Sequence, residues 1–200
     1  MSPTGPASRT LAIAGNPNVG KTSIFNHLTG QDLKVSNYPG VTVERHEGKL
    51  RIEGRDVLTV LDIPGTYSLS GRSAEEQIAI QAIAGIPPLT SPDLLVVVVD
   101  ATQLSRNLYL TLQAIELGVP TIVALTMVDA LERRKQRVDV EQLEAALGVP
   151  VIPVVGHKGT GIDRLKRRIG EVLDEPDRGK PGWRWHPQQP ALLEDRKSVV

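Results

Sequence analysis

The sequence predicts an α/β fold, a doubly wound and mostly parallel β-sheet with helices on both faces. Short runs rich in Val and Ile, apolar along their whole length, alternate with segments of helical periodicity. Such runs suit strands that are covered on both faces. The first run leads directly into GNPNVGKT at residues 15–22. Glycine, four residues and then Gly-Lys-Thr, set between a strand and a helix, is the spacing of a phosphate-binding loop.

Five strand-like runs each precede a helical segment. In chain order the pairs are 10–15 with 21–28, 56–62 with 74–85, 94–101 with 103–118, 120–126 with 139–148, and 150–155 with 161–173. Two of the helices run into a glycine, Gly118 and Gly148, which is the usual stop signal. We expect the third helix to place four apolar side chains on one face, Leu104, Leu108, Leu112 and Ile115.

One segment, residues 31–55, breaks this alternation. It contains a loop, then a strand-like stretch, then a turn at Glu53-Gly54. We expect its strand to pair antiparallel with the following one at the edge of the sheet. The predicted sheet therefore has six strands, of which one edge strand is antiparallel.

Length and composition indicate one ordinary globular domain. The chain has 200 residues, 40% of them hydrophobic and 23% charged, which suffices for one core but not for two large domains. The formal net charge is zero, so we expect no nucleic-acid partner. The absence of cysteine excludes disulfides and thiolate metal sites. The longest apolar run, residues 93–101, falls far short of the roughly 20 residues that span a bilayer.

We divide the chain into three parts. Residues 1–8 have no apolar core of the signal-peptide kind and are expected to be disordered. Residues 9–174 are expected to form the domain. From Glu175 the sequence is rich in Pro, Gly and charge, so residues 175–200 are expected to be a linker followed by the truncated start of a further helix.

The phosphate-binding loop (residues 15–22) offers three kinds of group to an anion. Its glycines let consecutive backbone N–H groups turn inward, and the following helix adds its positive end. Lys21 would neutralise β- and γ-phosphate oxygens, and the Thr22 hydroxyl would bind Mg²⁺. A chance match in an ordinary glycine-containing turn would lack the flanking strand and helix, and both are predicted here.

Further Mg²⁺ and γ-phosphate groups are expected at the same place. Asp62 ends an apolar strand and begins DIPG, where a carboxylate reaches the metal, usually through water, and the Gly65 N–H can contact the γ-phosphate. Thr42, in the stretch SNYPGVTVE, is the candidate for a second hydroxyl on Mg²⁺. From spacing alone, Thr42 is equally well an ordinary threonine of a surface loop.

The motif TMVD at residues 126–129 predicts which base is bound. Asp129 can accept hydrogen bonds from N1–H and N2–H₂ of guanine, and adenine has neither donor in that arrangement. Each such charge-assisted bond contributes about 1.5–3 kcal/mol, so the pair favours GTP or GDP over ATP. For Asp129 alone, a helix-capping role is the alternative. The loop at residues 156–158 could place a backbone N–H on guanine O6.

Taken together, these residues resemble a translation-factor-class GTPase domain with the Ras-like architecture of P-loop NTPases. More narrowly, they resemble the N-terminal G domain of the bacterial ferrous iron transport protein B. The stretches GNPNVGKTSIFNHLTG, VSNYPGVTVE and DIPGTYSL are similar to that family's versions of the three phosphate-side motifs. NYPGVTVE discriminates best, and the resemblance covers about residues 9–174.

The resemblance implies GTPase activity with two mobile loops. The first loop (residues 36–44) and the second loop (residues 64–77) would order around γ-phosphate and Mg²⁺, with Thr42 as a metal ligand, and relax after hydrolysis. It also implies K⁺ beside the phosphates, held by Asn18 and by backbone carbonyls of the first loop, where Ser36 and Tyr38 stand at the matching positions. K⁺ would replace an arginine finger. Thr66 stands where many GTPases have a water-positioning glutamine, so slow hydrolysis is expected.

The expected site is larger than these few residues. The expected nucleotide contacts are Gly15, Asn16, Pro17, Asn18, Val19, Gly20, Lys21, Thr22, Ser23, Gly40, Val41, Thr42, Asp62, Pro64, Gly65, Thr126, Met127, Asp129, Gly156, His157 and Lys158. Those expected to act in catalysis are Lys21, Thr42, Gly65 and Asn18, and those expected on Mg²⁺ are Thr22, Thr42 and Asp62.

Two positions depart from the family pattern. Thr126 replaces the usual asparagine, and a hydroxyl cannot both donate to guanine N7 and bind the phosphate-binding loop as an amide does. Losing one such bond costs about 0.5–1.5 kcal/mol, or about 2- to 12-fold in affinity. Gly156-His157 stand where Ser-Ala or Ser-Thr is usual, which is expected to loosen that loop.

The resemblance further implies a larger protein in the bacterial inner membrane. The family continues into a helical spacer and a polytopic membrane domain that carries Fe²⁺, so this chain would be a cytoplasmic regulatory piece with guanine nucleotide and the iron-permease domain as partners. A homo-oligomer is a further possibility. The alternatives are a soluble GTPase acting on ribosomal or transfer RNA, which the neutral charge disfavours, and a module that binds nucleotide without turnover.

The remaining polar and aromatic features favour ordinary structural roles. The four histidines are scattered without ligand spacing, so no metal beyond Mg²⁺ and K⁺ is expected. The basic run ERRKQR at residues 132–137 is expected to be a solvated face, with a docking patch as the alternative. Trp183 and Trp185 could pack on the domain or lie in a flexible segment.

Overall fold

A computed structural model describes residues 9–30 and 33–181 of the chain. The expected N-terminal tail (residues 1–8) and residues 182–200 of the expected linker, including both tryptophans, lie outside the described residues. Within the described part of the linker, a short 3₁₀ helix, η2 (Pro176–Gly179), follows the last α-helix.

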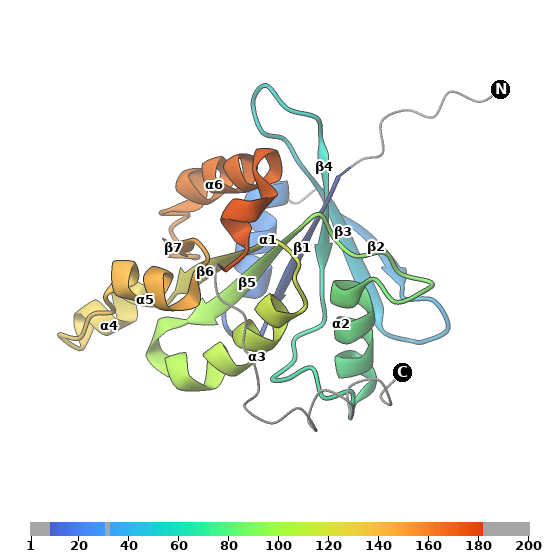
Figure 1. The fold of residues 1–200 in the computed structure, drawn as a ribbon, viewed down its shortest axis with the longest axis horizontal. Coiled ribbons are helices and arrows are strands. Elements are labelled where there is room, and N and C mark those ends of the chain that lie inside the picture. Colours follow the sequence, from blue (N-terminus) through green and yellow to red (C-terminus); the bar gives the residue numbers. More distant parts are fainter. Residues whose placement is uncertain (1–8, 31–32, 182–200) are drawn as a thin grey trace.

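A seven-stranded sheet forms the centre of the described part, in the order β2-β3-β4-β1-β5-β6-β7 (Figure 1). The strands are β1 (Thr10–Gly15), β2 (Leu33–Asn37), β3 (Glu44–Leu50), β4 (Leu58–Asp62), β5 (Leu94–Asp100), β6 (Thr121–Thr126) and β7 (Val151–Pro153). β3 is antiparallel to both of its neighbours, and the other pairings are parallel. The predicted fold class is confirmed.

The sheet has one strand more than the six expected. Residues Leu33–Asn37 form β2, which pairs antiparallel with β3 in the register Ser36↔Arg45, so that β2 rather than β3 is the edge strand. Every residue of β2 is exposed. Because no buried apolar face marks this segment, only its backbone hydrogen bonds to β3 make it a strand, and those are invisible in the residue pattern.

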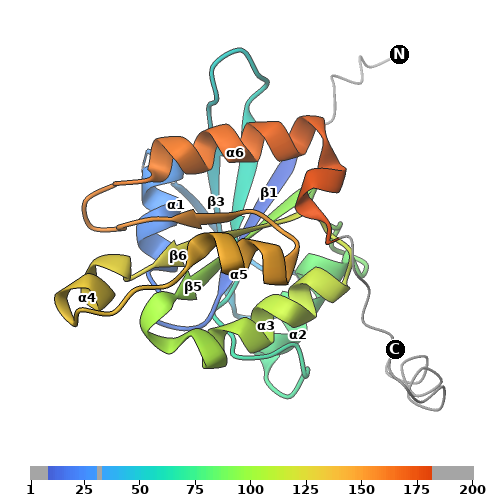
Figure 2. The same cartoon turned by 60° about the vertical axis from the view of Figure 1, so that its left-hand side comes forward.

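Helices cover both faces of the sheet. The α-helices are α1 (Lys21–Thr29), α2 (Ala74–Ala84), α3 (Leu104–Glu116), α4 (Val128–Arg133), α5 (Val140–Leu147) and α6 (Ile162–Asp174), and a 3₁₀ turn, η1 (Ala101–Gln103), precedes α3. α1 and α6 pack on one face, and α2, α3 and α5 on the other (Figures 1 and 2). Alternate residues of β5 contribute to the two cores, and all of them are buried.

Of the four apolar residues expected on one face of α3, Leu112 does not pack into the core. Leu104 and Leu108 are partly buried against the core, but Leu112 is 39% exposed. In a helix with 3.6 residues per turn, residues at every fourth position do not stay on one line, because each step of four residues shifts the position by about 40° around the axis. The row that starts at Leu104 therefore rotates toward solvent, and the buried face passes instead through Leu110 and Ala114.

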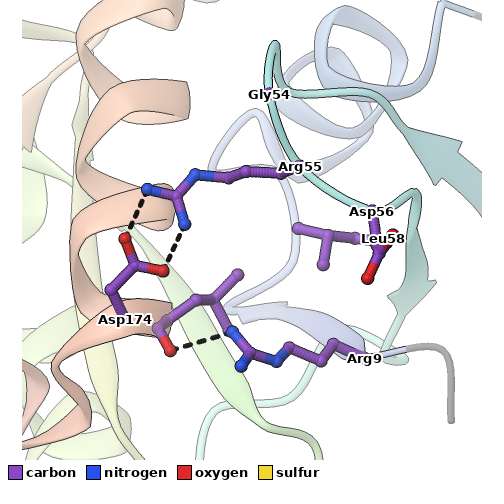
Figure 3. A pocket seen from close by; sticks show the side chains of 7 residues that line it. Arg9, Gly54, Arg55, Asp56, Leu58 and Asp174 are labelled. Atoms are coloured by element: carbon purple, nitrogen blue, oxygen red, sulfur yellow. Dashed lines mark hydrogen bonds and ion pairs between the residues drawn. The ribbon is translucent and has the colours of Figure 1, made fainter. Parts of the chain in front are cut away.

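A cavity of about 600 Å³ lies where β1 and β4 begin (Figure 3). Arg55, from the turn between β3 and β4, forms a bidentate ion pair with Asp174 at the end of α6. Arg9, just before β1, donates to the Leu173 carbonyl oxygen at 2.9 Å. The phosphate-binding loop follows the opposite end of β1, so this cavity is remote from the candidate site. Within the described residues, no helix has the length and apolar character needed to cross a bilayer.

Candidate functional site

The phosphate-binding loop leaves β1 and ends at the first residue of α1. A Cβ atom at Gly15 would lie 2.7 Å from the Val98 carbonyl oxygen, so only glycine lets the loop pass β5 this closely. Asn18 and Gly20 have positive φ angles of 64° and 90°, and Gly20 is the N-cap of α1. The loop thus curls over the N-terminus of a nine-residue helix, a geometry that presents backbone N–H groups and the helix dipole to an anion.

Lys21 from α1 and Asp62 from β4 meet beside this loop. Lys21 Nζ lies 2.5 Å from Asp62 Oδ1, and the two side chains are only 13% and 11% exposed. The ammonium group suits phosphate oxygens, and the carboxylate suits a divalent cation such as Mg²⁺. The structure therefore brings together, from two elements, the charged groups that a magnesium–phosphate complex needs.

Asn16 supplies an independent sign that the loop receives a ligand. It is 2% exposed, yet neither its side-chain nitrogen nor its side-chain oxygen has a partner within the described residues. Leaving a buried polar group unpaired costs about 1–3 kcal/mol, so such groups in native proteins call for a reason. Together with the curled backbone and the charges of Lys21 and Asp62, the unpaired amide fits a nucleotide phosphate with Mg²⁺.

The start of the second loop lies directly against the phosphate-binding loop. The Thr66 N–H donates to the Gly15 carbonyl oxygen at 3.3 Å. A Cβ atom at Gly65 would lie 3.3 Å from Pro17 Cα, so glycine permits the close approach. Pro64 and Gly65 are therefore placed where their backbone can contact a phosphate held by residues 15–22.

The rest of the second loop is bound to α3, which the sequence did not indicate. Arg106 lies over the Tyr67 ring, 4.0 Å from its centroid, and the Leu69 N–H donates to Gln113 Oε1 at 2.9 Å. Thr66 is 3% exposed, and its hydroxyl donates to the Ser68 carbonyl oxygen, within the same loop, at 2.8 Å. The two contacts with α3 join residues about forty apart in the chain, beyond the reach of local spacing rules.

Thr42 lies in an exposed turn of the first loop. Thr42 is exposed, beside Gly40 and Val41 in a turn that the Tyr38 N–H closes by donating to the Val43 carbonyl oxygen at 2.9 Å. Thr22 is also exposed. Across residues 9–30 and 33–181, no hydrogen bond or ion pair joins Thr42 to Thr22 or Asp62. Of the three residues expected on Mg²⁺, only Asp62 contacts Lys21.

Tyr38 attaches the first loop to the end of β4. Its ring is 3% exposed, and its hydroxyl donates to the Asp62 carbonyl oxygen at 3.4 Å. Burial raises the pKa of Tyr38 to about 12, so the hydroxyl stays protonated. Ser36 is exposed on β2, and Asn18 is exposed in the phosphate-binding loop. The Tyr38 carbonyl oxygen accepts from the Val41 N–H at 3.3 Å, and Ser36 pairs with Arg45 of β3.

Thr126, at the end of β6, binds the phosphate-binding loop. The residue is 2% exposed, and its hydroxyl oxygen lies 2.8 Å from the Val19 carbonyl oxygen and 3.1 Å from that of Val99. A hydroxyl donates a single hydrogen, and Val19 is the closer acceptor. Of the two roles of the usual asparagine, the threonine hydroxyl therefore keeps the contact with residues 15–22.

Asp129 follows a sharp turn at Met127, whose φ is 57°, and lies in the first turn of α4. Arg133 Nη1 lies 2.7 Å from Asp129 Oδ2. This hydrogen bond holds the pKa of Asp129 below its ordinary value, and the nearby His157 acts in the same direction. A carboxylate has about four acceptor positions, so the ionised Asp129 keeps capacity for the N1–H and N2–H₂ groups of guanine.

The 156–158 loop borders a small cavity of about 240 Å³, lined by Ser23, Asn26, His27, Gly156 and His157. His27 Nε2 lies 2.7 Å from the Gly156 carbonyl oxygen. Lys158 lies in the turn that its N–H closes by donating to the Val155 carbonyl oxygen at 3.1 Å. Sequence reasoning treated His27 as one of four scattered histidines, and nothing in its local sequence indicates the contact.

The described residues contain no group of three or more His, Cys, Asp or Glu side chains that could hold a metal ion. The proposed Mg²⁺ position differs from such a cluster, since it would use one carboxylate, hydroxyl oxygens and the phosphates themselves. The basic run at residues 132–137 is exposed along its whole length.

Comparison with known proteins gives one consistent family. The family described as Ferrous iron transport protein B matches residues 9–169. The Fe(2+) transporter FeoB of Salmonella typhimurium is 50% identical over 164 residues, which are 80% of this chain and 21% of that protein, and the Escherichia coli K12 transporter is equally similar. The chain thus spans about a fifth of the length of these relatives.

Solved structures agree with this result. The G domain of the T. maritima FeoB iron transporter is 38% identical with a TM-score of 0.74, over 82% of this chain and 98% of that one. A GDP-bound S. thermophilus NFeoB variant is 42% identical with a TM-score of 0.73, over 80% of this chain and 61% of that one. By sequence, fold and the arrangement of its phosphate-binding loop, the chain belongs to the ferrous iron transport protein B family, in the part that forms the G domain.

Proposed function

We propose that this chain binds GTP with Mg²⁺ at the carboxyl edge of its sheet and hydrolyses it slowly, faster in K⁺ than in Na⁺. The observation that carries the proposal is the contact of Lys21 with Asp62 beside the glycine-containing loop. The unpaired amide of Asn16 and the ionised Asp129 support phosphate and guanine respectively. The GDP bound by the S. thermophilus neighbour supports the same base.

Each residue has a definite task in this reaction. Lys21 would hold β- and γ-phosphate oxygens, while Asp62 and the Thr22 hydroxyl would hold Mg²⁺, which neutralises charge that develops on the phosphates. Thr42 would join them only if the first loop moves inward, since it is exposed in this structure. That movement is the ordering step by which γ-phosphate would be sensed.

The slow rate follows from Thr66. Its hydroxyl is buried and donates to Ser68, so it is not free to orient an attacking water. Asn18, which is exposed with positive φ in the phosphate-binding loop, would hold K⁺ together with backbone carbonyls of the first loop. A cation there would stabilise the transition-state charge.

The biological role we propose is regulation of ferrous iron uptake by the membrane domain of a full-length transporter on the cytoplasmic side of the inner membrane. Support comes from the curated relatives, which are named Fe(2+) transporters and of whose length the matched residues cover only 21%. The zero formal net charge of the chain disfavours the alternative, a ribosomal or transfer RNA partner.

Phosphate release from GTP tests the proposal, with KCl and NaCl compared at equal ionic strength. We expect wild type to be faster in KCl. Lys21→Ala should lose about 100-fold or more in rate, the scale of a removed transition-state contact, whereas Arg167→Ala on the exposed side of α6 should not. Asn18→Ala should abolish the difference between the salts. No hydrolysis in either salt, or full activity of Lys21→Ala, would contradict the proposal.

A further inference from the structure

We infer that His27 is a positioning residue for guanine: it fixes the peptide between Gly156 and His157 so that the His157 N–H faces the guanine O6. The inference rests on the proposed guanine nucleotide and adds the residue that orients one of its contacts. His27 belongs to α1, whereas the peptide lies beyond β7, 129 residues later in the chain.

The contact has a defined donor and acceptor. His27 Nε2 lies 2.7 Å from the Gly156 carbonyl oxygen, and a carbonyl only accepts, so Nε2 carries the hydrogen. The ring lies close against the loop, because a Cβ atom at Gly159 would come within 3.1 Å of His27 Cε1. Gly159 has a φ of 69°, a conformation that also favours glycine.

Planarity transmits this contact to the opposite side of the loop. The carbonyl of Gly156 and the N–H of His157 belong to one peptide unit, which is planar and trans. The two groups therefore point in opposite directions, and fixing the oxygen fixes the direction of the N–H. A hydrogen bond to the carbonyl also polarises the peptide, which strengthens the N–H as a donor.

Three other N–H groups of this segment are already used. The Val155 N–H donates to Thr160, the Lys158 N–H to Val155 and the Gly159 N–H to Gly156. For the His157 N–H, no acceptor occurs within the described part of the chain. Of the loop positions at 157–159, His157 alone therefore offers a backbone donor for a ligand.

The loop that carries this donor lies near the carboxylate proposed to bind the base. His157 is near enough to Asp129 to lower the pKa of that carboxylate. An N–H donor beside a carboxylate acceptor matches the edge of guanine, which presents O6 as an acceptor next to N1–H and N2–H₂ as donors. The expected loosening at Gly156-His157 is thus opposed by a hydrogen bond from α1.

Binding of two nucleotides can show whether His27 orients the contact to guanine O6 or only stabilises the fold. GDP carries O6 and N1–H, and the diphosphate of 2-aminopurine riboside lacks both but keeps the 2-amino group and the phosphates, so the loss of a contact to O6 affects GDP alone. Affinities of both for the purified chain would be measured by displacement of a fluorescent GDP. His27→Ala removes the donor, His27→Gln replaces it with an amide of similar reach, and His27→Asn carries the same amide one methylene shorter.

We expect His27→Ala and His27→Asn to weaken GDP by about 2- to 12-fold, the range of one hydrogen bond, with no change for the 2-aminopurine diphosphate. His27→Gln should restore GDP binding. Equal weakening of both ligands, or no change in either, would overturn the inference. Failure of wild type to bind GDP at all would instead refute the proposed function. Melting temperatures of all variants, expected to be close to wild type because His27 is exposed, check folding.

Discussion

Replacing Thr126 with valine should both destabilise the domain and weaken nucleotide binding. The change keeps the shape of the side chain but removes the hydroxyl that donates to the Val19 carbonyl oxygen at 2.8 Å in a buried position. Leaving that acceptor unpaired costs about 1–3 kcal/mol. For a domain of this size, each kcal/mol lowers the melting temperature by about 2–4 °C, so a loss of about 2–12 °C is expected.

The expected loss of GDP affinity follows from the position of Val19 in the chain. It lies two residues before Lys21, inside the phosphate-binding loop. If half of the lost free energy is needed to hold this loop in its binding conformation, GDP affinity falls by about 2- to 12-fold. The measurements are thermal unfolding of the free chain and calorimetric titration with GDP.

Thr121→Val is the matched control. Thr121 is on the same strand, is fully buried, and its hydroxyl donates to the Val119 carbonyl oxygen at 2.8 Å. It lies at the opposite end of β6 from the nucleotide site, so its loss should lower the melting temperature without changing GDP affinity. If Thr126→Val and Thr121→Val had the same GDP affinity, the Thr126 contact would not hold the loop and the reasoning would be refuted.

Three further outcomes are expected. Asp129→Asn should change the preferred nucleotide from GDP to xanthosine diphosphate, as measured by competition binding. Unchanged GDP binding would contradict the role of Asp129 in recognising the base. The hydrogen bond from Arg55 holds the pKa of Asp174 below its ordinary value. The Arg55–Asp174 pair therefore stabilises the fold fully at pH values above the ordinary carboxyl pKa of about 3.9. This stabilisation is lost as the pH falls through the lowered pKa. Denaturant unfolding should therefore show Arg55→Ala less stable than wild type at neutral pH and equal to it in acid; a constant difference would contradict the ion pair. Because the pKa of Tyr38 is raised to about 12 from an ordinary value of about 10, the folded state retains the proton. The free energy of unfolding should fall more steeply in wild type than in Tyr38→Phe as pH rises through this window, and parallel profiles would contradict the raised pKa.

The parallel part of the fold was predictable because its central strands, β1, β5 and β6, are almost completely buried. β1 spans residues 10–15 as expected, and the apolar runs of β4, β5 and β6 mark their strands within about two residues. Burial on both faces leaves an unambiguous pattern in the sequence. β2 leaves none, because its residues are all exposed, and α4 was missed because six residues are too few to show a helical period.

In the candidate site, too, some residues could be predicted from the sequence and some contacts could not. Lys21 and Asp62 could be proposed because each stands in a motif at the carboxyl end of a strand, and parallel strands bring those ends to one edge of the sheet. The contact of His27 with Gly156 could not be proposed from the sequence, since it joins residues 129 apart that belong to no common motif. The position of the exposed Thr42 depends on the conformation of a loop, and spacing does not determine that.

The complete burial of β5 has a consequence for the unfolded chain. Leu94–Val99 is a run of six aliphatic residues without charge, Pro or Gly, a composition that favours intermolecular cross-β association once it is released from the core. An aspartate stands on each side of the run. In the native state Asp93 accepts from the Thr10 N–H and Asp100 from the Thr102 N–H. During synthesis or heating, the same two carboxylates would repel their copies in neighbouring chains and so limit aggregation.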